Sequence, residues 1–216
     1  MDMFNMYLWT TQAIIMARFA FHIKSPAEQG KVMRFGQVIV AWPMLFVAIF
    51  AFFYGEKLLF IYTKFSPEEI ATTAAILKLL FAASFIHSMW VIYGTFLSVS
   101  NHERFVNRAV LAGVGLNIVL NLVFIPAYGP IAAAWSTIAS FGLICLLYVW
   151  RTQTKTDIRV PYDRMALLLL GVALATVCFW ILGKTSLPWW LVTLIAAAVY
   201  GLSALLTGLL SRKLLQ

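Results

Sequence analysis

The chain has 216 residues, of which 62% are hydrophobic and 11% charged, and its formal net charge is +8. A soluble chain of this length would carry more apolar surface than one core can hide, so the composition excludes a water-soluble globular domain. Neither cysteine belongs to a metal or redox pattern, and no phosphate-binding loop or catalytic carboxylate pair is found, so we do not expect an enzyme.

The first predicted helix, Phe4–His22, is interrupted by polar residues. At 100° per residue Arg18 and His22 fall on one side of it, while Ile15 and Phe19 face elsewhere. Two interpretations follow: a membrane span that packs against other helices, or a helix that lies in the membrane interface. We count this segment as a span.

Six longer apolar runs follow, and each is long enough to cross a bilayer as a helix, because about 20 residues at 1.5 Å rise match a hydrocarbon core of roughly 30 Å. Barrel strands would instead alternate in polarity over about ten residues. The sequence therefore predicts an all-α polytopic membrane protein with about seven transmembrane helices. The six runs are Val38–Tyr54, Ile70–Ser98, Ala109–Ile125, Ile131–Trp150, Met165–Leu182 and Trp190–Leu210.

Lysine and arginine are retained on the cytoplasmic side of short loops, and their placement here predicts an orientation. With alternating spans, three lysines fall outside: Lys57, Lys64 and Lys184. The N-terminus is then outside and the C-terminus cytoplasmic. Because this bias accounts for the basic charge, no nucleic acid partner is needed. The twelve cations on the predicted cytoplasmic side are Arg18, Lys24, Lys31, Arg34, Arg104, Arg108, Arg151, Lys155, Arg159, Arg164, Arg212 and Lys213.

Small and amide-bearing residues gather around the turn between the third and fourth apolar runs. Asn117 and Asn121 lie one helical turn apart, and Pro126 is expected to stop that helix after Ile125. Small residues four apart on the next helix predict close approach of two helix backbones, which drives helix association in lipid. We therefore expect a packing motif made of Pro126, Gly129, Ala132, Ala133, Ser136 and Thr137.

This segment resembles a family signature. The order of Asn117, Asn121, Ile125-Pro126, Tyr128-Gly129, Ala132-Ala133 and Ser136-Thr137 is similar to that of polysaccharide flippases of the O-antigen type, within the multidrug/oligosaccharidyl-lipid/polysaccharide exporter superfamily. Members have fourteen helices in two lobes. The resemblance implies that this chain is the second lobe and that an N-terminal lobe is missing. It also divides the chain into a first helix with a basic cytoplasmic loop (1–36), a four-helix core (37–152), and a basic linker with two terminal helices (153–216).

The resemblance further implies flipping of a polyprenyl-pyrophosphate-linked oligosaccharide for cell-surface polysaccharide such as lipopolysaccharide, by alternating access. The expected location is a prokaryotic cytoplasmic (inner) membrane, and the expected partners are the lipid-linked oligosaccharide, membrane lipid, the missing lobe and glycan polymerase machinery. Two alternatives stay open: a multidrug exporter of the same superfamily, and a non-transporting scaffold or remnant. No cofactor is expected, and transport would be coupled to protons or to sodium.

Three residues are candidates for substrate binding. Arg18 suits a pyrophosphate because guanidinium binds phosphate in a bidentate way, although it can also snorkel to the interface as a topology anchor. His87 lies mid-span, where an imidazole serves either as a proton relay or sugar contact, or as a neutral group bonded to a neighbouring helix. Lys78, also within a span, requires a cavity, a partner or snorkelling.

Asn117 and Asn121 complete the set of candidate substrate-binding residues. Their structural interpretation is a pair of hydrogen bonds to a neighbouring helix, and we prefer it. Their functional interpretation is contact with the glycan or ligation of a coupling ion.

Overall fold

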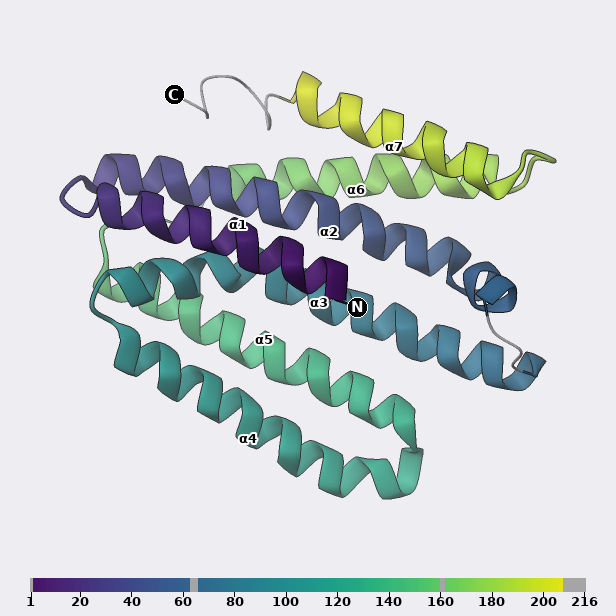
Figure 1. Ribbon diagram of the computed structural model, residues 1–216, viewed down its shortest axis with the longest axis horizontal. Coiled ribbons are helices and arrows are strands. Elements are labelled where there is room, and N and C mark those ends of the chain that lie inside the picture. The colour runs from purple at the N-terminus through teal and green to yellow at the C-terminus, as the bar shows by residue number, and fades with distance from the viewer. Residues whose placement is uncertain (1, 63–65, 160–161, 208–216) are drawn as a thin grey trace.

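The structure is a computed structural model that describes residues 2–62, 66–159 and 162–207 (Figure 1). The regular elements in these residues are all α-helices, and six of them are long and apolar enough to cross a membrane. The chain is therefore an all-α polytopic membrane protein, whereas a seventh crossing by the first helix stays a prediction. The helices are α1 (Asp2–Phe21), α2 (Pro26–Tyr62), α3 (Pro67–Val99), α4 (Glu103–Tyr128), α5 (Pro130–Lys155), α6 (Tyr162–Leu182) and α7 (Trp189–Leu206).

Six helices contact one another in the order α4, α5, α3, α2, α6, α7, and α1 lies against both α2 and α3. Figure 1 shows that the α1–α2, α3–α4 and α5–α6 connections share one end of the bundle, at the left of the view. We call this the basic end, because ten of the twelve cations predicted to be cytoplasmic lie in and around these three connections, and the other two, Arg212 and Lys213, lie outside the described residues. The α2–α3, α4–α5 and α6–α7 connections lie toward the opposite end.

The segment Ile23–Gly36, expected to be a loop, is mostly helical because α2 begins at Pro26. Proline suits the first turn of a helix, and Glu28 in that turn complements the helix dipole. Glu28 also pairs with Lys31 at 3.0 Å across one turn. The 37 residues of α2 rise about 55 Å. The helix therefore exceeds the roughly 30 Å hydrocarbon core and has to tilt or project from it.

Two further helix ends differ from expectation. α4 does not stop after Ile125 but continues through Pro126 to Tyr128, and Gly129 then turns the chain at a φ of 67°. Lipid offers no water to a free carbonyl, so continuing the helix satisfies more backbone groups than stopping at the proline. At the basic end α5 continues to Lys155, so its last turn takes up the start of the basic linker expected from residue 153.

One buried cluster joins α1, α2, α3 and α5. Ile15 and Phe19 of α1 are almost fully buried, and the Phe19 ring lies 5.4 Å from that of Phe96 on α3. Gly36 lets α1 approach α2, since a Cβ there would lie 3.0 Å from the Ile15 side chain. The predicted separation of Ile15 and Phe19 from Arg18 is confirmed, because Arg18 is exposed.

A second buried cluster joins α2 to the terminal helices α6 and α7. The Trp42 and Tyr200 rings stack with centroids 4.6 Å apart, and the Tyr200 hydroxyl donates to the Trp42 carbonyl at 3.0 Å. Phe179 of α6 is buried in the same cluster. α2 therefore contributes to both clusters and connects the two sides of the bundle.

The outer surface of the bundle is apolar, as lipid requires. On α4, Leu111 and Leu122 are each about 70% exposed, among many other large apolar side chains of that helix. Such a surface would be costly in water and is neutral in hydrocarbon.

We predict that Gly113 sets the approach of α4 to α5. A Cβ at Gly113 would lie 2.5 Å from the Ile144 side chain and 3.3 Å from the Ser140 carbonyl oxygen, whereas one at Gly115 would meet nothing within 4 Å. Gly113→Leu should therefore destabilise the protein by about 1–3 kcal/mol through overpacking. The free energy of unfolding in detergent measures this.

Gly115→Leu is the matched control, because it gains the same helix propensity two residues away on the same helix. Its free energy of unfolding should be unchanged or higher. Equal destabilisation by both substitutions would show that the contact at Gly113 does not hold the two helices together.

Candidate substrate path

Arg18 lies one turn before the end of α1 and is exposed, with its guanidinium carbon 5.4 Å from the centroid of the Phe35 ring on α2. This cation–π contact holds the guanidinium against α2 and leaves its positive charge in place. The structure thus places Arg18 on the outer face of α1, with its donors free to contact an anion. Its role as a substrate residue stays a prediction.

His87 lies on α3 and packs against α5. Its ring stacks on that of Phe141, with centroids 4.9 Å apart and planes 27° apart. Two turns further along the same face of α3, Gly94 also meets α5, since a Cβ there would lie 2.7 Å from the Tyr148 ring. The face that carries His87 therefore lies against a neighbouring helix in this structure, and the residue is half-buried there.

Lys78 has a partner that the sequence had not indicated. Its Nζ lies 3.0 Å from Oε1 of Glu56 on α2, and 5.5 Å from the centroid of the Phe52 ring. The Glu56 side chain is 60% exposed and that of Lys78 29%. The available signal was charge complementarity, because these opposite charges lie on the two helices that flank one connection.

Asn117 and Asn121 bond to each other along α4, with Nδ2 of Asn121 donating to Oδ1 of Asn117 at 2.9 Å. Among the described residues the pair therefore bonds within α4, and the expected bonds to a neighbouring helix stay a prediction. Oδ1 of Asn121 is buried and accepts no hydrogen bond among the described residues. This oxygen is therefore available to accept a hydrogen bond or to bind a cation.

The packing motif follows the α4–α5 turn. Ala132 and Ser136 are buried, Ala133 and Thr137 are half-buried, and the hydroxyls of Ser136 and Thr137 donate to carbonyls one turn back on α5 at 2.8 and 2.9 Å. Ala132 and Ser136 also line a groove of about 450 Å³ between α4 and α5. The other residues of this groove are apolar or aromatic: Leu120, Phe124, Tyr128, Ile131, Trp135 and Ala139.

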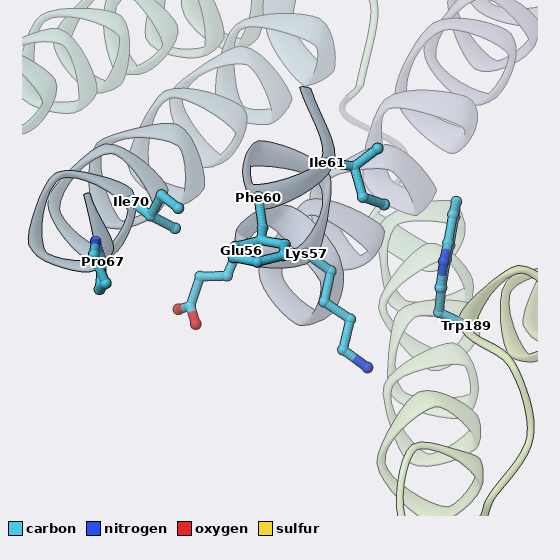
Figure 2. A pocket seen from close by; sticks show the side chains of 7 residues that line it. All are labelled: Glu56, Lys57, Phe60, Ile61, Pro67, Ile70 and Trp189. Carbon is cyan, nitrogen blue, oxygen red and sulfur yellow. The ribbon is translucent and has the colours of Figure 1, made fainter. Parts of the chain in front are cut away.

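A hollow of about 490 Å³ lies at the end opposite the basic end, around the last turns of α2. Figure 2 shows that Glu56 and Lys57 point to different sides of α2 and that Trp189, from the start of α7, flanks it on the Lys57 side. Glu56 is already paired with Lys78. The hollow is mostly apolar, with one carboxylate and one ammonium at its rim.

The five predicted substrate-binding residues do not converge on one cavity within the part of the chain that the structure describes. Arg18 contacts Phe35, His87 contacts Phe141 and Lys78 contacts Glu56, so each has a separate neighbour. No three histidine, cysteine or carboxylate side chains of the described residues gather as metal ligands would. A single binding site would therefore need further protein surface opposite these faces.

Comparisons with known proteins show partial similarity to two flippases. No protein-family model matches the chain. A protein named probable low-salt glycan biosynthesis flippase Agl15, from Haloferax volcanii, is 26% identical over 98 residues, which are 45% of this chain and 21% of that protein.

Among solved structures, the lipid II flippase MurJ in an inward closed conformation is similar over 99% of this chain with a TM-score of 0.76 and 14% identity. The match covers 45% of the MurJ chain, so the chain spans less than half the length of both proteins. At this identity the similarity shows the fold, and the chain has the fold of one part of a flippase.

Proposed function

We propose that this chain forms the second lobe of a flippase that carries a polyprenyl-pyrophosphate-linked oligosaccharide across a prokaryotic cytoplasmic membrane. The observation that carries the proposal is the fold similarity to a lipid II flippase over 99% of the chain. The partial sequence similarity to a glycan biosynthesis flippase supports the same substrate class.

The chemistry of such a substrate sets what the path must provide. Its pyrophosphate and sugars are too polar for the hydrocarbon, so a protein has to offer cations and hydrogen-bonding groups away from lipid. The outer face of α1 offers one such cation, because Arg18 is exposed there and held beside Phe35. A first lobe that covered this face would enclose Arg18 in a cavity, where its bidentate donors suit a phosphate.

In an alternating-access mechanism, helix faces that pack together in this structure become exposed in another state of the transporter. His87 is half-buried against Phe141 of α5, and separation of α3 and α5 would expose it further to water or to a sugar. Asn121 keeps a buried acceptor oxygen on α4. In this mechanism both groups respond to rearrangement within the lobe, whereas Arg18 remains at the interface between lobes.

We predict that Met1–Gln216 restores surface glycan in a flippase-deficient strain only when a first lobe of the same superfamily is co-expressed. The physical reason is that one lobe supplies only one wall of the path. Surface glycan, scored by labelled lectin and compared at equal protein level, measures this. Restoration by the chain alone would contradict the proposed half-transporter, and absence of glycan with every first lobe tried would contradict the flippase assignment.

In the two-lobe protein, Arg18→Ala should lower glycan export about tenfold or more, because a charge-assisted hydrogen bond is worth about 1.5–3 kcal/mol. Arg34→Ala is the matched control, since Arg34 is an exposed arginine of α2 at the same end, and it should leave export unchanged. Equal loss in both variants would assign Arg18 to topology instead of substrate binding.

His87→Ala and His87→Phe should both lower export at unchanged protein level. Phenylalanine keeps an aromatic ring against Phe141 and removes only the imidazole nitrogens. Full export by His87→Phe would therefore assign His87 to packing between α3 and α5.

A further inference from the structure

A hollow of about 270 Å³ lies at the basic end, outside the path described above. Three segments that are distant in the sequence form it: the start of α2, the α3–α4 connection and the end of α5. Its lining is polar at the mouth and apolar where Phe96 and Ile158, both almost fully buried, form the floor. The other lining residues are Ile23, Pro26, Gln29, Ser100, Asn101, His102, Lys155, Thr156 and Asp157.

Gln29 gives the hollow a polar amide group. Its side chain is only 6% exposed and lines the hollow, and its amide group makes no hydrogen bond among the described residues. Its amide atoms are not among the side-chain atoms that are fully buried without a partner, so the amide group opens onto the hollow. The amide of Gln29 is therefore placed to bind a polar group that enters the hollow.

Positive charge surrounds this amide. Lys155 contributes an ammonium to the lining, and the neighbouring Arg151 has a buried Nε that makes no hydrogen bond among the described residues. The His102 imidazole bonds to the backbone of Lys155, and burial, aided by the charge of Arg151, holds its pKa below the usual value. His102 is therefore neutral at pH 7, and the lysine and the arginine provide the cationic charge.

The lining also contains Asp157, whose carboxylate offsets one of these cations and accepts from hydroxyl groups. This combination suits a singly charged phosphodiester that carries hydroxyl donors better than it suits a free dianion. Pockets for drug-sized ligands measure about 300–1,000 Å³, so a hollow of this size takes a headgroup and not a whole lipid. Connections at the end of a transmembrane bundle lie at the depth of lipid headgroups.

We propose that this hollow binds the headgroup of an anionic phospholipid of the phosphatidylglycerol type. Lys155 and the Gln29 amide contact the phosphodiester, Asp157 accepts from the glycerol hydroxyls, and the acyl chains remain in the bilayer. The site requires only that the chain lies in a membrane, so it is independent of the proposed flippase function. It would fix the basic end of the bundle against the adjoining leaflet.

The test is a titration of purified Met1–Gln216 in neutral detergent with phosphatidylglycerol and with phosphatidylcholine of the same acyl chains, followed by native mass spectrometry. Phosphatidylglycerol should bind saturably and more tightly. Lys155→Gln should weaken it about fivefold, the usual effect of one cation at an anionic lipid surface. Gln29→Glu should weaken it as well, because it keeps the size of the side chain and adds a negative charge.

Lys31→Gln is the matched control, because Lys31 lies at the same end, is exposed and does not line the hollow. It should change the affinity less than twofold. Equal weakening by Lys31→Gln and Lys155→Gln would reduce the effect to general surface charge and overturn the proposal. Equal binding of both lipids, or displacement of phosphatidylglycerol by millimolar inorganic phosphate, would overturn it as well. Lys155 is exposed, so its substitution tests the site even where Gln29→Glu fails to fold.

Discussion

The absence of water within a bilayer is the constraint on which this structure depends. Polar groups there have to be satisfied by the chain itself, and within α5 the hydroxyls of Ser136 and Ser140 donate to carbonyls one turn back at 2.8 and 2.7 Å. Because these hydroxyls are already bonded within their own helix, helix association depends on how closely the helix surfaces fit together. The contact of α4 with Ser140 across Gly113, and the stacking of Trp42 on Tyr200, are contacts of that kind.

Three polar groups that are not satisfied in this way lie on helices or at an end of the bundle where the chain can meet something else. Arg18 on α1 contacts the Phe35 ring, Oδ1 of Asn121 on α4 has no partner among the described residues, and the Gln29 amide opens onto the hollow at the basic end. Asn121 lies on α4, at one end of the contact order of the bundle, and Arg18 lies on the exposed side of α1, which packs on α2 and α3. The proposed first lobe would dock on these faces. Gln29 lies at the end of the bundle, at the depth of lipid headgroups.

Much of the fold could be predicted from the sequence, because uninterrupted apolar runs of bilayer length have no other stable conformation. One predicted boundary was wrong because a helix carries charged residues. Lys31 indicated a loop but lies in α2, since a helix longer than the membrane is thick accommodates such charges. The partners of the site residues were not predictable in the same way. The pairing of Lys78 with Glu56, and of His87 with Phe141, depends on how helices are rotated and shifted against one another, which composition does not determine.

The most direct test of this account is the side of the membrane on which the basic end lies. In a protein without Cys145 and Cys178, Ala27→Cys marks the first turn of α2 and Ser186→Cys marks the α6–α7 connection, and both positions are exposed. A membrane-impermeant maleimide applied to intact cells should label Ser186→Cys alone, and Ala27→Cys should react only after permeabilisation. The reverse pattern would contradict the orientation, and labelling of both in intact cells would contradict a bundle that crosses the membrane.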